Sequence, residues 1–90
     1  MPLLMLFISR LLWDSWNVAH IARHEVVPAE VEEVCHGEPM AEQGKKGRIR
    51  LVGPTIRGRM LAIILEREGE GIYYVVTARP ASREERRRYQ

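Results

Sequence analysis

Cysteine is almost absent from this chain of 90 residues, in which Cys35 is the single one. A lone cysteine excludes a disulfide within the chain and fits a reducing compartment, so we expect a cytoplasmic protein. The CxxC and HExxH patterns that hold zinc are missing too, and we expect no metal and no other cofactor. Cys35 itself is expected to be buried and inert on the apolar side of a helix.

Long hydrophobic runs are also missing. The apolar stretch from Leu3 to Ile8 is too short to cross a bilayer, and no basic side chain precedes it as in a secretory signal. We therefore expect no membrane partner and interpret the stretch as part of a buried first strand. Apolar residues make up 46% of the sequence and charged residues 29%, which is typical of one globular domain over residues 1–90.

Acidic side chains are absent from Lys45 to Leu65, a stretch that holds six basic ones. Residues 1–44 carry a net charge of −5 and residues 45–90 carry +7, so the overall +2 hides a strong asymmetry. A basic segment of this kind is typical of a surface that binds a polyanion. We expect it to contribute to a nucleic-acid-binding surface, while the acidic half could face a basic partner.

The hydrophobic patterns predict an α+β fold with the element order β-α-α-β-β-β-α. Helices are expected at 16–24, where Asp14 or Ser15 caps the start, and at 28–36, which Pro28 begins and Gly37 ends. Trp13 and Trp16 are expected to anchor the helices to the sheet.

The expected strands are 6–13, 47–52, 59–66 and 72–77, with a loop at 37–45. Short turns join the last three strands into an antiparallel meander. The N-terminal strand is expected to add to this meander, and the two helices to pack on one face of the sheet.

The C-terminal segment, Thr77 to Tyr89, is the most informative one. Arg79 is expected at the end of the last strand, and Ser82 and Glu85 form a capping box that begins a short helix. Five arginines lie within ten residues here. A guanidinium suits phosphate oxygens because it presents a planar fork of donors. A helix rich in arginine and glutamate is also often only a solvated surface, and both interpretations stay open here.

Three segments, in order along the chain, match the motifs of one known family. They are Trp13-Asp14 followed by Asn17, His20, Arg23 and His24; Arg48 followed by Gly53; and Thr77-Ala78-Arg79 followed by Ala81, Glu85, Arg86 and Tyr89. With this set the chain resembles the BrnT family of toxins from type II toxin–antitoxin systems, small ribonucleases of broadly RelE-like architecture. The resemblance implies metal-independent RNA cleavage and a cognate antitoxin as partner. Both a homo-oligomer and a hetero-oligomer fit the sequence.

RNA cleavage without a metal needs a base, an acid and positive groups that stabilise the phosphorane. Arg48 and Arg79 are the candidates for the positive groups. His20 and His24 are the candidates for acid and base, because imidazole titrates near neutral pH and residues four apart share a helix face. A histidine on a short helix also serves as a cap or a packing residue, which is the competing interpretation. The expected RNA-binding residues are Arg23, Lys45, Lys46, Arg50, Arg59, Arg83, Arg86 and Tyr89.

The chain departs from the family pattern at three positions, so it resembles a divergent member of the family. Gly47 stands where the family usually has an acidic residue, His20 replaces an asparagine, and Glu25 replaces a glycine. The first departure removes a candidate general base. It favours the alternative function, a non-catalytic nucleic-acid- or partner-binding module of the same fold.

Overall fold

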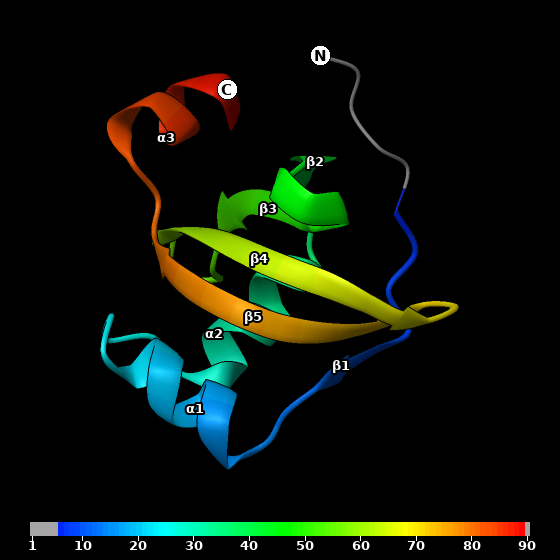
Figure 1. Ribbon diagram of the computed structural model, residues 1–90. Coiled ribbons are helices and arrows are strands. Elements are labelled where there is room, and N and C mark those ends of the chain that lie inside the picture. Colours follow the sequence, from blue (N-terminus) through cyan, green and yellow to red (C-terminus); the bar gives the residue numbers. More distant parts are fainter. Residues whose placement is uncertain (1–5, 90) are drawn as a thin grey trace.

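The computed structural model describes residues 6–89, which form a five-stranded mixed sheet with helices on both faces (Figure 1). The elements are β1 (Arg10–Leu12), α1 (Ser15–Ala22), α2 (Pro28–Cys35), β2 (Met40–Gln43), the 3-10 helix η1 (Lys45–Gly47), β3 (Ile49–Pro54), β4 (Met60–Gly69), β5 (Ile72–Pro80) and α3 (Arg83–Tyr89). The strand order is β1-β5-β4-β3-β2, in which β2 to β5 are antiparallel and β1 is parallel to β5. The α+β class and the antiparallel meander are as predicted, but the sheet has one strand more.

The main core lies between the sheet and the two helices α1 and α2. Leu51, Ile63 and Val75 point to this side from three neighbouring strands, and all are fully buried. Ile21 of α1 and Val31 of α2 meet them and are fully buried as well. Both helices therefore cover the same face of the sheet, as the sequence predicted.

The opposite face is covered in part by α3, and we call it the α3 face. Register places Val52 of β3 beside Ala62 of β4, and Ala62 beside Arg79 of β5. Val52 and Ala62 form a small buried cluster with Ala81, which Tyr89 of α3 closes. This cluster docks α3 at one end of the sheet.

A buried amide fixes the start of α1. Asp14 caps the helix, and its side chain and that of Asn17 exchange hydrogen bonds with each other's backbone at 2.9 Å. The Asn17 amide also donates to the carbonyls of Leu12 and Val75, both at 3.0 Å, and the residue has no exposed surface. Asn17 thus ties α1 to the point where β1 ends beside β5.

The loop predicted at 37–45 is wrong, because residues 40–43 form β2. This edge strand pairs antiparallel with β3, and Glu42 lies opposite Arg50. Alanine, glutamate and glutamine have low strand propensity, so the local sequence favours a loop. Pairing with β3 and burial of Ala41 and Glu42, each 5% exposed, override that preference.

The first strand is also shorter than predicted. Residues 3–5 lie outside the described residues, and β1 begins only at Arg10 and pairs with three residues of β5. Phe7 is 72% exposed, so the expected buried strand does not include it. Gly71 fixes the chain just before β1, because its carbonyl accepts a hydrogen bond from Ser9 N at 2.8 Å. Its φ of +73° is a conformation that glycine adopts without strain.

The remaining elements differ from prediction by a few residues at their ends. Helices α1 and α2 have eight residues each and α3 has seven. Within residues 6–89, none of the helices has the length and apolar content needed to cross a membrane.

Replacement of Asn17 by alanine tests the role of the buried amide. Asn17→Ala should lower the free energy of unfolding by roughly 2–4 kcal/mol, because two carbonyls lose their donor and α1 loses part of its capping box. Chemical denaturation measures this difference. Val18→Ala is the matched control, since its side chain is 38% exposed and should contribute little. Equal loss of stability in both variants would contradict the assigned role.

Candidate functional site

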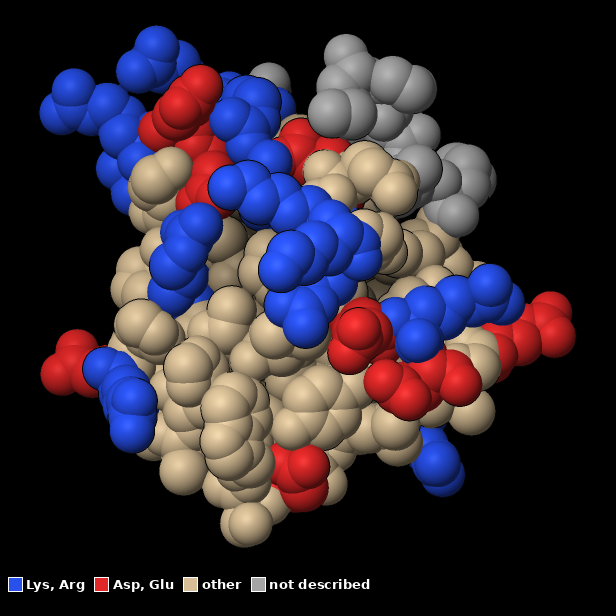
Figure 2. All heavy atoms as spheres, in the orientation of Figure 1, with Lys and Arg blue, Asp and Glu red and all other residues tan. Residues whose placement is uncertain are grey.

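Four of the predicted basic residues line one hollow on the α3 face. Lys45, Lys46, Arg48 and Arg50 surround a space of about 330 Å³ together with Gly44 and Ile64. No carboxylate belongs to this lining, as far as residues 6–89 define it. Figure 2 shows Lys and Arg side chains gathering over β3 and α3, with acidic groups among them. The hollow therefore has the charge that a phosphate chain requires.

The turn η1 positions these residues, and it also explains Gly47. Lys46 has a φ of 58° and Gly47 a φ of +77°, and this left-handed pair turns the chain from β2 into β3. A β-carbon at Gly47 would meet no atom within 4 Å, so space does not exclude a side chain there. The backbone does disfavour one, because the left-handed region costs roughly 1–2 kcal/mol for residues other than glycine. Glycine suits this position because of its backbone conformation.

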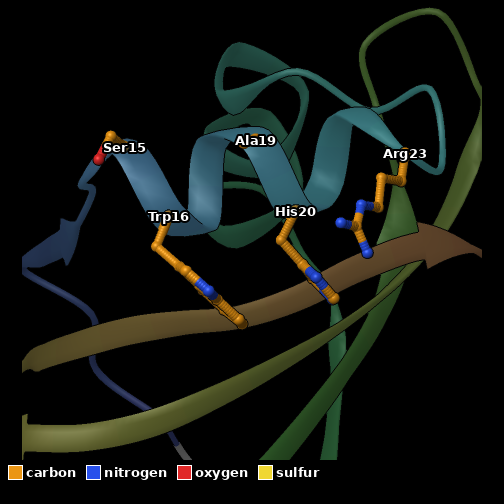
Figure 3. A pocket seen from close by; sticks show the side chains of 5 residues that line it. All are labelled: Ser15, Trp16, Ala19, His20 and Arg23. Carbon is orange, nitrogen blue, oxygen red and sulfur yellow. The ribbon is translucent and has the colours of Figure 1, made fainter.

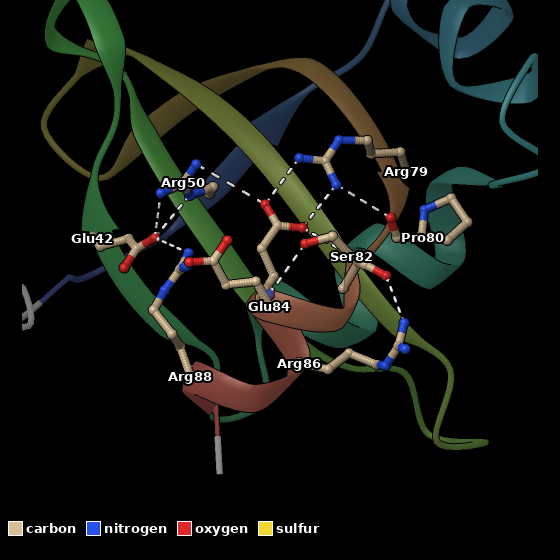
Figure 4. A network of polar contacts seen from close by, with 10 residues as sticks. Glu42, Arg50, Arg79, Pro80, Ser82, Glu84, Arg86 and Arg88 are labelled. Atoms are coloured by element: carbon tan, nitrogen blue, oxygen red, sulfur yellow. Dashed lines mark hydrogen bonds and ion pairs between the residues drawn. The ribbon is translucent and has the colours of Figure 1, made fainter.

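Arg79 lies on the α3 face at the end of β5 and is held by Glu85. Its Nη1 and Nη2 atoms donate to the two Glu85 oxygens at 2.8 and 2.9 Å. The same carboxylate accepts from Ser82 N at 2.8 Å, which confirms the predicted capping box. The hydrogen bonds from Arg79 lower the pKa of Glu85 to about 2, despite burial, which opposes the shift. Figure 4 shows Arg79 and Ser82 converging at the start of α3.

A second buried carboxylate, Glu42, holds Arg50 and Arg88. Arg50 Nε donates to Glu42 Oε1 at 2.8 Å, and Arg88 Nη2 donates to the same oxygen at 2.9 Å (Figure 4). Burial alone would raise the pKa of Glu42, but the hydrogen bonds from both arginines outweigh it and lower the pKa. Arg50 Nη1 also lies 4.0 Å from Glu85 Oε2, so the two carboxylates share one network. We call Glu42, Arg50, Arg79, Glu85 and Arg88 the carboxylate network; it carries three positive and two negative charges.

The arginines of this network keep donors for a further anion. A guanidinium has five N–H groups. Arg79 donates three of them, two to Glu85 and one to the Pro80 carbonyl. The pairing also raises the pKa of Arg79 above its usual value, which keeps it charged. The side chain is 39% exposed, and its remaining N–H groups make no hydrogen bond within the described residues.

A second group of predicted residues lies on α1. His20 and Arg23 line a hollow of about 540 Å³ with Ser15, Trp16 and Ala19. Figure 3 shows the side chains of Trp16, His20 and Arg23 projecting from the same side of the helix. The rings of Trp16 and His20 stack with their centroids 4.9 Å apart, and the His24 ring meets His20 edge-on at 5.9 Å.

The two groups lie toward the same end of the sheet, α1 on one face and Arg79 on the α3 face. Arg59, which directly precedes β4, donates to the His24 carbonyl at 3.4 Å, and Met60 accepts from Ala81 N at 2.9 Å. The end of α1, with His24, and the end of β5, with Arg79, therefore lie at the same end of the sheet. Arg48 precedes β3 at the opposite end, and strand spacings place it roughly 16 Å from Arg79 between Cα atoms.

Several expected RNA-binding residues are engaged within the chain. Arg59 pairs with Glu30 at 3.0 Å, the Tyr89 hydroxyl donates to the Glu38 carbonyl at 3.0 Å, and Arg86 donates to the Ala81 carbonyl at 2.8 Å. Arg83 is exposed at the start of α3. These contacts connect α3 and the β3–β4 turn to the rest of the fold, and they give Arg59 and Tyr89 structural roles.

The two tryptophans have different roles. Trp13 is an anchor, as predicted, because its indole nitrogen donates to Glu32 at 2.8 Å and its ring packs against the main core. The same prediction for Trp16 is wrong, since this side chain is 60% exposed. An exposed position follows from the helix start at Ser15, which turns Asn17 and Ile21 inward instead.

The sequence analysis missed the role of two residues. Glu42 fell in the predicted loop, and only the register of β2 against β3 brings it to Arg50. Asn17 belongs to the matched motif, but its buried amide was assigned no function. The prediction for Cys35 is confirmed as to burial, and burial, aided by Glu32, raises the pKa of its thiol to about 12.

Comparisons with protein-family models, with curated proteins and with solved structures found no match to this chain. In the described part of the chain, no group of three histidine, cysteine or acidic side chains is arranged to hold a metal ion.

The low pKa of Glu85 predicts a pH-dependent stability. The folded pKa, about 2, lies below the ordinary value of 4.5, so the stabilisation is complete above pH 4.5 and is lost as the pH falls toward 2. Glu85→Gln should remove on the order of 2 kcal/mol at neutral pH and flatten this dependence. Denaturation at several pH values measures both. Glu84→Gln, at a side chain 81% exposed, is the control and should resemble the parent. Parallel pH profiles for parent and Glu85→Gln would contradict the assignment.

Proposed function

We propose that this protein is a ribonuclease toxin of a type II toxin–antitoxin pair, acting on single-stranded RNA in the cytoplasm without a metal ion. One observation carries the proposal. Five basic residues, Lys45, Lys46, Arg48, Arg50 and Arg79, follow one another across the α3 face, and we call them the basic track. The track runs toward the end of the sheet where His24 lies.

The track combines mobile and fixed charges. Lys45 and Lys46 are exposed on η1, whereas Arg50 and Arg79 are held by the carboxylate network. A guanidinium held in one orientation presents its donors in a fixed direction, so it binds a phosphate in one defined position. Exposed lysines add attraction that falls with salt. Together they suit a phosphate backbone that lies across the sheet.

The proposed RNA cleavage takes place at the end of the basic track that is nearer to His24. Arg79 and Arg23 supply positive charge for the phosphorane, and the exposed His24 ring exchanges a proton with the 2′-OH or the leaving oxygen. Arg48 lies at the far end and binds RNA rather than the reacting phosphate. The His20 ring stacks on Trp16 and meets His24 edge-on, so His20 positions the His24 ring rather than transferring a proton. This agrees with the amide that the BrnT family carries at this position.

The backbone at Glu25 supports the resemblance on which the toxin assignment rests. Glu25 has a φ of 61°, in the left-handed region that glycine adopts most readily. The family carries glycine at this position. A cognate antitoxin that covers the basic track with acidic groups would keep the toxin inactive.

The alternative is a non-catalytic nucleic-acid- or partner-binding module of the same fold. The lowered pKa values of the two carboxylates beside the basic track favour this alternative. Their lowered pKa values make Glu42 and Glu85 weak bases, so neither replaces the acidic residue that is missing at Gly47. Cleavage would then depend on His24. Replacing this imidazole should strongly reduce the activity of an enzyme, and it should leave the binding of a non-catalytic module unchanged.

Salt dependence tests the basic track. Affinity for a short single-stranded RNA should fall steeply with salt, because each neutralised phosphate releases counterions. The double variant Lys45→Gln/Arg48→Gln should reduce the log–log salt slope by about 2 and weaken binding to all sequences alike. Arg57→Gln, on the exposed β3–β4 turn, is the control and should leave the slope unchanged. A parental slope in the double variant would contradict the track.

His24→Gln decides between enzyme and binding module. Glutamine retains hydrogen bonding but cannot transfer a proton, so RNA cleavage should slow by roughly 10²–10⁴-fold with little change in affinity. His36→Gln is the matched control, because His36 lies at the end of α2 and contacts Glu32 at 3.1 Å. Cleavage by His24→Gln at the parental rate would refute histidine catalysis. A parent protein that binds RNA and never cuts it would establish the alternative.

A further inference from the structure

Three aromatic rings form a strip along α1 that the catalytic role of His24 does not explain. Trp16 and His20 lie four residues apart on one face of α1, and the ring of His24, which follows the end of the helix, meets His20 edge-on. The Trp16 and His20 rings are nearly parallel, with 6° between their planes. The strip therefore begins with a flat, preformed stack.

The exposure of Trp16 distinguishes it from a packing residue. Its side chain is 60% exposed, and it belongs to neither of the two apolar clusters. Trp13, three residues earlier, packs against the main core and donates a hydrogen bond to Glu32. Indole faces that stay open to water are sites at which another flat group can bind.

The surroundings of Trp16 favour a nucleotide over an uncharged aromatic ligand. The hollow of about 540 Å³ beside it holds the guanidinium of Arg23, and no carboxylate belongs to its lining as residues 6–89 define it. Trp16, His20 and Arg23 project from the same side of α1 (Figure 3). A base stacked on the indole would thus have a positive group nearby for its phosphate.

We propose that Trp16 is a base-stacking residue: a nucleobase of single-stranded nucleic acid continues the Trp16–His20 stack, and Arg23 contacts the adjoining phosphate. The inference rests on the nucleic-acid-binding part of the proposed function and adds a subsite on α1, past the His24 end of the basic track. Stacking accepts every base, because every base has a π face. The subsite therefore adds affinity and preference for single strands, without sequence specificity.

Fluorescence of Trp16 provides the direct test. The chain has two tryptophans, so Trp13→Phe leaves Trp16 as the sole indole. The probes are a single-stranded oligothymidylate, which has no 2′-OH and cannot be cleaved, and an abasic deoxyribose-phosphate oligomer of equal length. The oligothymidylate should quench the indole emission and bind roughly 5- to 100-fold more tightly than the abasic oligomer.

The variant Trp16→Leu completes the experiment in the chain that retains Trp13. Leucine keeps an apolar side chain at an exposed position, so the fold should persist, but it has no ring to stack. Its binding, measured with labelled oligomers, should show no preference for bases and an unchanged affinity for the abasic oligomer. Trp16→Phe should restore part of the preference.

Each outcome decides the matter. Equal quenching by both oligomers, an unchanged base preference in Trp16→Leu, or no binding of either oligomer overturns the stacking role and leaves the strip to another partner, such as a protein. RNA cleavage is assayed separately. Cleavage without base preference refutes only this inference, and base preference without cleavage refutes only the ribonuclease.

Discussion

Two buried carboxylates, Glu42 and Glu85, hold the arginines of the α3 face in place. Glu85 joins the start of α3 to Arg79 of β5, and Glu42 joins β2 to Arg50 of β3 and, through Arg88, to the end of α3. Removing one partner of such a pair leaves the other charge buried and unpaired, which is strongly destabilising. The network therefore holds α3, the edge strand β2 and the two track arginines as one unit.

This network also affects what the arginines can do. Arg79→Ala is a poor test of catalysis, because it removes the partner of a carboxylate that is only 5% exposed and so changes stability together with activity. Variants at Lys45, Arg48 and His24 avoid this difficulty, since these side chains are at least partly exposed and lie outside the carboxylate network. Arg79 thus has a structural role in addition to its proposed role in binding, whereas Lys45, Arg48 and His24 can be replaced to test binding and cleavage alone.

Local patterns predicted most of the fold, and nonlocal pairing accounts for the rest. The hydrophobic patterns, the expected cap at Asp14 or Ser15 and the capping box at Ser82 were sufficient to predict the three helices and four of the five strands. The strand β2 was not predictable, because Met-Ala-Glu-Gln has little strand propensity and is stabilised by its register with β3. The parallel position of β1 likewise depends on contacts with Gly71, far along the chain.

The candidate site was predictable as a set of residues but not as an arrangement. The charge asymmetry and the spacing of His20 and His24 identified the basic segment and one face of α1. The sequence could not reveal the pairing of Arg50 and Arg79 with buried glutamates, or the exposure of Trp16, because both depend on tertiary contacts. The left-handed backbone at Gly47 and Glu25 was likewise not predictable from the sequence.

The central claim is that single-stranded RNA lies across the α3 face and ends at α1. Backbone amide NMR spectra, recorded during titration with a 2′-O-methyl RNA that cannot be cleaved, test it most directly. The proposal predicts chemical-shift changes at Arg48, Arg50, Arg79 and His24, and none at residues 31–35 of α2. Shifts confined to α2, or none along the basic track, would contradict it.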